Sequence, residues 1–404
     1  MSMIESLTLM LALIYGTSLL YWSGKKWGAI ASATTLLAAT LSTLYWPLSL
    51  CLALAAVTIG VLGRLRPQWV NGEQRINTQR EVIHHLLALS MLLVGIQFAA
   101  NAVMLKMGMT PWLMRPDVGD AFLPIAGGIE IKAIVTLGLW DQNHPAAAVM
   151  LTLVLLTGLL CKRAFCGWAC PLGLAGEYLY KFRKRFIKSE LLPPKWLDWP
   201  LRMLKYLLLA GLLYIIITMP TTSLPQYLNG NYHKIADLKM ALFFITPGLV
   251  TLIGFGIILG LAAWRRQGFC RYICPYGALL GLLSFLSPFK IRRNTKHCLI
   301  ESRGMGCDKC TRACPAAINV HTQANIRSDE CQACMRCISA CPKKEALQFS
   351  TRNGIQLSGR GLMIMLLMIL FMLPLIAYSC GYWVSQTPTE IRMYLIQHLN
   401  AIGH

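Results

Sequence analysis

The chain has 404 residues, of which 55% are hydrophobic and 14% are charged, and its mean hydropathy is +0.52. This composition excludes an ordinary soluble enzyme and indicates a membrane protein. The formal net charge of +21 could suit a nucleic-acid-binding protein, but the basic residues fall in blocks between apolar stretches. We therefore expect no nucleic-acid partner.

The apolar stretches predict about eight transmembrane helices, because each is long enough to cross the hydrocarbon layer of a bilayer. Three fall in an N-terminal region (1–80), four in a membrane core (81–289) and one in a C-terminal region (359–404). The expected spans are 7–22, 28–45, 47–63, 84–104, 145–161, 203–219, 243–264 and 361–383. The predicted fold class is an all-α polytopic membrane protein with an inserted α+β ferredoxin-like cytoplasmic domain at 290–358.

The basic residues predict which side of the membrane each loop occupies. If the spans alternate in direction, 32 of the 38 Lys and Arg residues fall on one side. Basic loops stay in the cytoplasm, so we expect a multi-pass protein of the bacterial inner membrane with 290–358 inside and 106–144 outside. In the outer loop, acidic residues offset the few basic ones: Asp117, Asp120, Glu130 and Asp141. Basic segments would also attract anionic membrane lipid.

Eight cysteines between residues 298 and 341 have the spacing typical of a two-cluster ferredoxin. The second run reads C-x2-C-x2-C-x3-C-P, in which three thiolates bind one [4Fe-4S] cluster and the fourth crosses to the other. The expected ligands are Cys298, Cys307, Cys310 and Cys341 for one cluster, and Cys331, Cys334, Cys337 and Cys314 for the other. Eight residues separate Cys298 from Cys307, so this ligand needs a longer loop than the compact motif has. A zinc ribbon or a disulfide set is the alternative, but neither has this triple run.

An internal repeat places four more cysteines. A shift of 104 residues aligns FCGWACPLG at 165–173 with FCRYICPYG at 269–277. Repeats in the same orientation pack about an axis along the membrane normal, which would bring the two cysteine pairs face to face. Four thiolates would suit a third [4Fe-4S] cluster, and its expected ligands are Cys166, Cys170, Cys270 and Cys274. A zinc site, a copper-binding thiol pair and a metal-free corner of packed thiols stay open as alternatives.

Polar residues in the span 84–104 raise the question of a quinone site. His84 and His85 open this span, and Gln97 and Asn101 lie deeper on one face of it. A quinone headgroup could be their partner, and hydrogen bonding between helices is the alternative. No nucleotide-binding or nucleophile motif is visible in the sequence, so we predict no catalytic residue.

The paired C-x3-C-P motifs and the two-cluster segment together resemble the NapH, NosR and CcoG group of membrane polyferredoxins over about residues 82–350. NapH with additional transmembrane helices is the nearest pattern. This resemblance implies that the twelve cysteines named above are cluster ligands, and that the chain works with other respiratory electron-transfer subunits in a quinone-linked chain. Our function hypothesis is an electron-transfer subunit that links the quinone pool to a redox partner. The alternatives are a CcoG-like factor that reduces copper during oxidase assembly, and an iron-sulfur redox sensor or membrane anchor.

Overall fold

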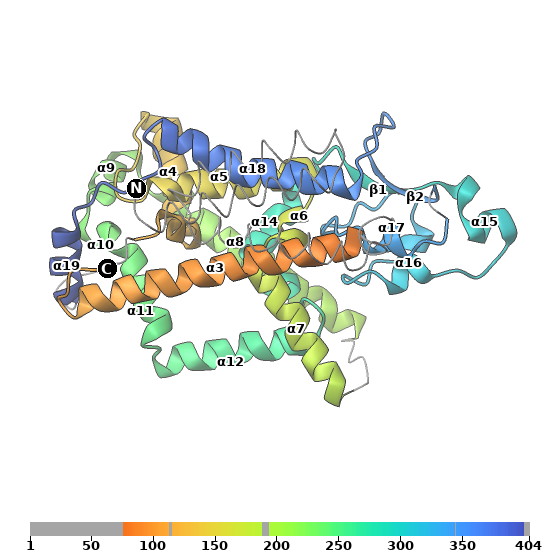
Figure 1. The fold of residues 1–404 in the computed structure, drawn as a ribbon, viewed down its shortest axis with the longest axis horizontal. Coiled ribbons are helices and arrows are strands. Elements are labelled where there is room, and N and C mark those ends of the chain that lie inside the picture. The colour runs from red at the N-terminus through yellow and green to blue at the C-terminus, as the bar shows by residue number, and fades with distance from the viewer. Residues whose placement is uncertain (1–75, 113–114, 188–193, 344, 400–404) are drawn as a thin grey trace, which may run out of the picture. The chain divides into compact units, whose positions relative to one another are not determined.

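The computed structural model describes residues 76–112, 115–187, 194–343 and 345–399. This part of the chain is mostly helical and contains one small sheet (Figure 1). It divides into two compact units, each built from separate stretches of the chain. The first unit comprises residues up to Met91 together with Leu156–Leu192 and Ala262–Phe371; the second comprises Leu92–Leu155, Pro193–Leu261 and Met372–His404.

The elements vary widely in length. The longer helices are α3 (Ile76–Lys106), α4 (Pro124–Leu137), α5 (Pro145–Cys161), α7 (Pro171–Phe186), α8 (Lys195–Thr218), α11 (Ala236–Ile245), α12 (Leu249–Trp264), α14 (Pro275–Leu283), α18 (Gly359–Ser379) and α19 (Thr389–Gln397). The short helices are α6 (Ala164–Trp168), α9 (Leu224–Leu228), α10 (Asn231–Lys234), α13 (Gly268–Tyr272), α15 (Leu299–Arg303), α16 (Lys309–Arg312) and α17 (Arg336–Ala340). The 3-10 turns are η3 (Asp117–Phe122), η4 (Thr221–Ser223), η5 (Thr295–His297) and η6 (Val320–Thr322).

The prediction of about eight transmembrane helices is wrong. Among the described residues, two helices are long and apolar enough to cross a membrane, Trp196–Thr218 and Gly359–Ser379. A third span arises only if α11 and α12, which meet at a bend of 77°, count as one. Helix α5 is apolar but has only 17 residues. The expected span at 84–104 lies in α3, whose side chains are described in part, and the spans at 7–22, 28–45 and 47–63 lie outside the described residues.

The first unit contains the cysteine-rich segment, which is closed by a two-stranded sheet. Strand β1 (Lys290–Arg293) precedes the eight cysteines and strand β2 (Leu347–Ser350) follows them. The strands are antiparallel, with Lys290 opposite Ser350. Ile291 of β1 and Phe349 of β2 belong to a buried apolar core, which also receives Leu362 of α18. Figure 1 shows these strands beside α16 and α17, with α15 lying farthest out.

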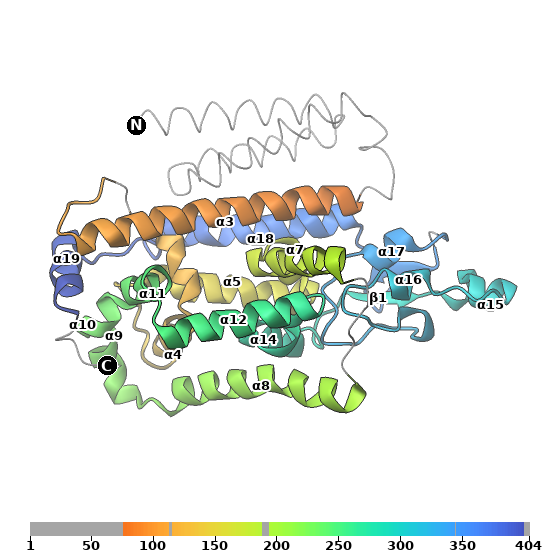
Figure 2. The ribbon, with the colours of Figure 1, turned by 90° about the horizontal axis from the view of Figure 1, so that it is seen from below.

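Two smaller apolar cores lie among the described residues of the second unit. In one, Leu395 of α19 packs with Leu238 of α11 and Phe98 of α3. In the other, Ile129 of α4 packs against Leu224 of α9. The short helices α9 and α10 lead into α11, as Figure 2 shows. The domain boundaries predicted after residues 80, 289 and 358 stay a prediction.

Candidate metal centres

Each C-x3-C-P motif forms a corner between two helices of the first unit. Cys166 lies in α6 and Cys170 precedes α7, while Cys270 lies in α13 and Cys274 precedes α14. A proline disfavours the helical conformation for the residue that precedes it. Cys170 and Cys274 accordingly have extended backbones, with ψ angles of 119° and 113°. The chain therefore turns between the two cysteines of each pair.

The glycine two residues after each proline allows the corner to close. A Cβ atom on Gly173 would lie 2.6 Å from the carbonyl oxygen of Cys166. A Cβ atom on Gly277 would lie 2.9 Å from the carbonyl oxygen of Cys270. These carbonyls belong to the backbone and cannot move aside without opening the corner. The identity of glycine in both copies of the repeat thus has a steric cause.

The four thiols of the two corners lie close enough to affect one another. Burial, and then the thiol of Cys166, raises the pKa of Cys170 to about 12. The pKa of Cys270 lies well above its usual value because of burial and then because of Cys274, Cys170 and Cys166. The structure therefore brings the thiols of both repeats together. Thiols of this kind stay protonated at neutral pH unless a metal displaces the proton.

A buried guanidinium lies beside this thiol group. Arg163 is fully buried. It donates hydrogen bonds to the carbonyl oxygens of Cys270, at 3.4 Å, and Asp329, at 3.1 Å. Burial lowers the pKa of Arg163, but the thiol of Cys166 and the carboxylate of Glu330 outweigh this effect, so the pKa is raised. A fixed positive charge in this position suits an anionic metal–thiolate centre.

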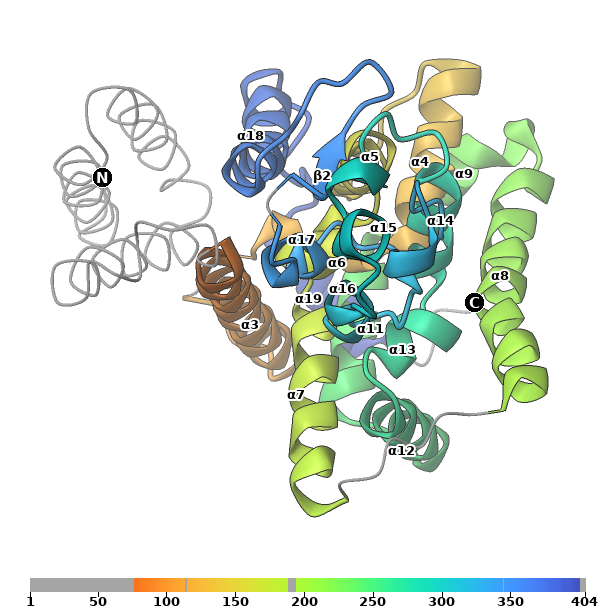
Figure 3. The same cartoon turned by 90° about the vertical axis from the view of Figure 1, so that its right-hand side faces the viewer.

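The corners contact the cysteine-rich segment directly. Three hydrogen bonds join them: Trp168 Nε1 to the carbonyl of Ala333 at 3.1 Å, Gln267 Nε2 to Gln332 Oε1 at 2.8 Å, and Arg271 Nη1 to the carbonyl of Ala316 at 3.2 Å. Figure 3 views the segment from its outer end, with α15, α16 and α17 toward the viewer. All three bonds end on residues within three positions of an expected cluster ligand, so the corners help to position the ligand loops.

The eight cysteines of the segment line two separate cavities. The first cavity is lined by Cys314, Cys331, Cys334 and Cys337 together with apolar side chains such as Ile318 and Val320. The second is lined by Cys298, Cys307, Cys310 and Cys341 together with Arg293, Lys309 and Lys343. Each cavity thus combines ligands from both runs of the sequence. We name the four cysteines of the first cavity the inner group and those of the second cavity the outer group. The four cysteines of the two C-x3-C-P corners are the corner group.

The three sets of cysteines follow one another in space. A Cβ atom on Gly167, beside Cys166, would lie 3.5 Å from Cys334 Cβ, so the corners adjoin the inner group. The thiol of Cys310 in the outer group is close enough to contribute to the raised pKa of Cys337 in the inner group. The order is corner group, inner group, outer group.

The donor atoms of each set fit an iron-sulfur cluster. Each set offers four sulfur atoms, the number that a [4Fe-4S] cluster takes from cysteines. The inner cavity is otherwise lined mainly by apolar side chains, and Cys331 and Cys337 are both buried. Soft thiolates in such surroundings are ligands for iron-sulfur clusters.

The sequence matches known iron-sulfur families over these same regions. Residues 143–189 and 247–294, which contain the two corners, match a family described as a 4Fe-4S binding domain. Residues 290–342 match a family described as a 4Fe-4S dicluster domain. YccM of Escherichia coli (strain K12), for which electron transport is a provisional assignment, is 36% identical over 301 residues, covering 73% of this chain and 83% of YccM.

The chain belongs to the family of ferredoxin-type membrane electron-transfer proteins. Its relatives include the ferredoxin-type protein NapH of Escherichia coli (strain K12), 24% identical over 54% of this chain and 74% of NapH. The regulatory protein NosR of Pseudomonas aeruginosa is 24% identical over 44% of this chain but only 23% of NosR. No solved structure matches the chain. The resemblance to NapH and NosR is confirmed, and the chain is a membrane-associated iron-sulfur electron transport protein.

A carboxylate links the first corner to the inner group. Arg336 of α17 donates to both oxygens of Glu177 in α7, at 2.6 and 2.9 Å. Arg266 and Lys181 each lie 3.4 Å from Glu177 Oε1. Burial would raise the pKa of Glu177, but Arg336 and the other cations lower it to about 2. Glu177 is therefore ionised and holds α17 against α7.

The histidines considered for a quinone have protein partners. His84 is buried and its Nε2 lies 2.8 Å from the carbonyl oxygen of Cys170. His85 is exposed; its Nδ1 lies 2.5 Å from the carbonyl of Glu81, and its Nε2 bonds the hydroxyl of Tyr178. Gln97 and Asn101 belong to the second unit. His84 thus contacts the first corner through the backbone of a cysteine.

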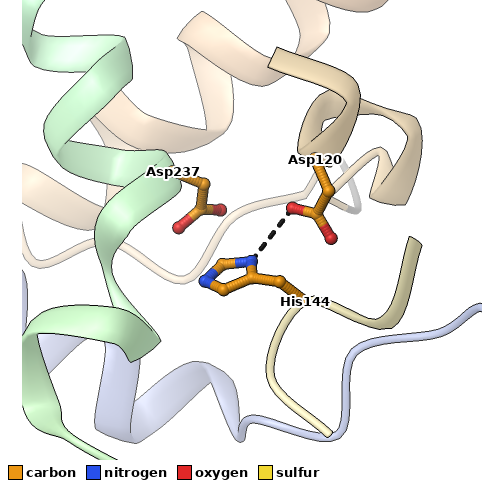
Figure 4. A group of neighbouring side chains, drawn as sticks. All are labelled: Asp120, His144 and Asp237. Carbon is orange, nitrogen blue, oxygen red and sulfur yellow. Dashed lines mark hydrogen bonds and ion pairs between the residues drawn. The ribbon is translucent and has the colours of Figure 1, made fainter. Parts of the chain in front are cut away.

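The second unit contains a further set of residues of metal-ligand type. Asp120, His144 and Asp237 are buried and offer ligand atoms within 4.8 Å of one another (Figure 4). Arg115, however, donates to both carboxylates, at 2.8 Å to Asp237 Oδ2, and Arg392 also pairs with Asp237. Two guanidinium groups already neutralise these carboxylates, so the geometry supports a buried ion-pair network rather than a metal centre.

Sequence reasoning missed the residues that surround the cysteines. Arg163 and Glu177 belong to no motif that marks them in the sequence. Asp120 was counted as an offsetting charge in a loop. Arg163 and Glu177 meet partners 166 and 159 residues away in sequence, so no local pattern reveals them. Asp120 pairs with Arg115, five residues away, and with His144.

Proposed function

We propose that this protein carries single electrons between the quinone pool and a redox partner through three [4Fe-4S] clusters. The observation that carries this proposal is the series of three four-cysteine sets in one compact unit. The corner group contacts the loop of the inner group, and the inner group adjoins the outer group. Electron transfer through a protein needs a series of adjacent redox centres. The clusters would supply the redox chemistry, and the protein would hold them next to one another.

Each set would hold one cluster. Cys166, Cys170, Cys270 and Cys274 would bind the first; Cys314, Cys331, Cys334 and Cys337 the second; Cys298, Cys307, Cys310 and Cys341 the third. The protein supplies thiolates, excludes water from the inner cavity and fixes the spacing of the sets. Cys166 and Cys270 are buried and Cys170 and Cys274 are half-buried, so two of the four corner thiols are not exposed to a copper ion in solution, which weighs against the copper-reducing alternative.

The corner group is the end that would exchange electrons with quinone. It follows the apolar helices α5 and α12 in the chain, so it lies where a lipid-soluble electron carrier can approach. His84 adds a polar side chain at this point through its contact with Cys170. Quinol oxidation here would deliver electrons one at a time toward the inner group.

The proposed location is the bacterial cytoplasmic membrane, with the ferredoxin segment in the cytoplasm. The basic residues that flank the segment support this orientation. A reporter fusion placed after Gly304 should give a cytoplasmic signal. A periplasmic signal from that fusion would overturn the orientation.

Anaerobic purification with iron and sulfide analysis tests the number of clusters. Three clusters predict about twelve iron atoms and twelve sulfides per chain, since each cubane holds four of each. About eight of each would leave the corners without a cluster. Reduction of the clusters by a quinol, followed by EPR, tests the link to quinone; unreduced clusters in the presence of excess quinol would remove it.

A further inference from the structure

Exposed basic residues line the outer cavity, at Lys309 and Lys343, or lie within four positions of its ligands in the sequence, at Lys296 and Arg303. Lys296, Arg303, Lys309 and Lys343 are exposed, and none has a carboxylate partner among the described residues. We name these four residues the cation rim. The acidic residues nearby are already paired: Glu301 with Arg293, Asp308 with Arg312 and Glu345 with His297.

The outer group also lies nearer to solvent than the inner group. Cys298, Cys307 and Cys341 are half-buried, and the neighbouring Pro342 is exposed. The inner group is covered by the corners, which bond to the loop that carries Cys331 and Cys334. An electron that enters or leaves the series through water-soluble protein would do so at the outer group.

A loop next to the cation rim projects from the segment. The eight residues between Cys298 and Cys307 include α15 and an exposed stretch from Glu301 to Gly306. This loop carries Arg303 of the rim and Met305, which is 52% exposed. An exposed apolar side chain beside cations is an arrangement found at protein–protein interfaces.

We infer that the cation rim is the docking surface for an acidic, soluble one-electron carrier protein, such as a flavodoxin or a small acidic ferredoxin. Attraction between a positive rim and a negative patch steers encounter and fixes orientation. The exchange is one electron, with one-electron oxidation of the carrier balanced by one-electron reduction of the protein, or the reverse. With an oxidised flavodoxin, the electron is accompanied by one proton taken up from water; with a ferredoxin, no proton is transferred. This inference rests on the proposed function, because it assigns the partner at the outer end of the same series.

The geometry favours a soluble partner over a lipid surface. In the first unit, α15 and the beginning of the apolar helix α18 lie on opposite sides of the β1–β2 pair (Figure 1). A membrane that holds α18 would therefore lie away from the loop that carries Arg303. Anionic lipid is then an outcome that the test must distinguish.

The test measures binding rather than electron transfer. The full chain, with its clusters and in detergent, is titrated with oxidised flavodoxin at low and at moderate salt. We expect the Kd to rise with salt, and the double change Lys296→Glu and Arg303→Glu to weaken binding at low salt about tenfold, because two attractive contacts become repulsive. The matched control is Arg327→Glu with Arg352→Glu, which makes the same charge change at exposed positions outside the rim and should change the Kd less than twofold.

Iron content and EPR of every variant establish that the clusters are intact. Equal weakening by the rim variant and the control, or no binding of flavodoxin to the wild type, would overturn the docking surface. Capture by phosphatidylglycerol vesicles that is lost in the rim variant, without flavodoxin binding, would assign the rim to lipid instead. Flavodoxin binding without quinol-dependent reduction would contradict the proposed quinone link and leave the docking surface in place.

Discussion

Trp168 of the first corner donates a hydrogen bond from Nε1 to the carbonyl oxygen of Ala333 at 3.1 Å. Ala333 lies between two expected ligands of the inner group, Cys331 and Cys334, and has a positive φ of 47°. Trp168 is 1% exposed. A residue of the first C-x3-C-P repeat thus holds a strained turn of the cysteine-rich segment, and the two regions form one structure around the cysteines.

The corner cysteines should behave as one site. Removing either Cys170 or Cys274 by substitution with alanine should lower iron by about four atoms per chain, because a four-thiolate centre becomes labile when one ligand is lost. The double variant should lose no more than either single variant. Iron analysis of purified protein measures this, with the exposed Cys380→Ser as the control. Wild-type iron in all three corner variants would show that the corners hold no cluster.

Arg163 should set the reduction potential of the corner cluster. A nearby positive charge stabilises the more negative, reduced form, so Arg163→Gln should shift the potential of that cluster downward. Arg163→Lys keeps the charge and should shift it much less. An EPR-monitored redox titration measures both. A potential that is the same in Arg163→Gln as in the wild type would show that this guanidinium is structural only.

Glu177 should stabilise the contact between α7 and α17. Glu177→Gln keeps the shape of the side chain but leaves Arg336 without its counter-charge, at a cost on the order of 3 kcal/mol. Hydrogen exchange in α17 should become faster. Glu345→Gln removes a more exposed pair and should change exchange little. Unchanged exchange in the Glu177 variant would mean that this ion pair does not hold the helices together.

Arg115 should be essential to the stability of the second unit. It pairs with Asp117, Asp120 and Asp237, so Arg115→Ala leaves buried carboxylates uncompensated and should cost about 3–5 kcal/mol. Adding Asp120→Asn should recover part of this loss, because the two residues share one network. Thermal unfolding in detergent measures both, with Arg202→Ala, at a more exposed pair, as the control. Strictly additive losses would contradict the network.

Glu130 should make stability depend on pH. Burial, and then the charge of Asp141, raises the pKa of this carboxyl to about 9, while its ordinary value is 4.5. The folded protein therefore holds a proton that the unfolded chain releases, and this stabilisation is present below about pH 4.5 and is lost as pH rises toward 9. Glu130→Gln should flatten the dependence between pH 5 and pH 9. A melting temperature with the same pH slope in both proteins would exclude Glu130 as the cause.

The iron-sulfur chemistry could be predicted from the sequence because ligand spacing is a local property, while the assignment of individual ligands stays a prediction. The four cysteines of one C-x2-C-x2-C-x3-C-P run occupy a short loop, and the repeat of C-x3-C-P is visible without a structure. The number of spans was wrong because apolar composition does not reveal whether a helix is long and straight enough to cross a membrane. Helix α5 has the bounds expected for it, 145–161, but only 17 residues, and the chain bends by 77° between α11 and α12, near Pro247. Proline cannot donate the backbone hydrogen bond that a continuous helix requires.

The charged residues of the site could not be predicted from the sequence. Arg163 meets the carbonyl of Asp329, and Arg115 meets Asp237, across more than one hundred residues. Such pairings depend on tertiary packing, and a single sequence holds no periodicity that reports them. Glu130 and Asp120 lie close to apolar stretches, and a charged residue in such a place requires a buried partner. This pattern predicts that a partner exists but does not identify it.

The bonds from Trp168, Gln267 and Arg271 to the ferredoxin segment come from both copies of the repeat. Each copy therefore tethers the segment at a different point, and two tethers prevent the rotation that a single one would allow. Tunnelling rates fall exponentially with the gap between donor and acceptor. Hydrogen bonds from both copies of the repeat would therefore keep this gap constant between the corner group and the inner group.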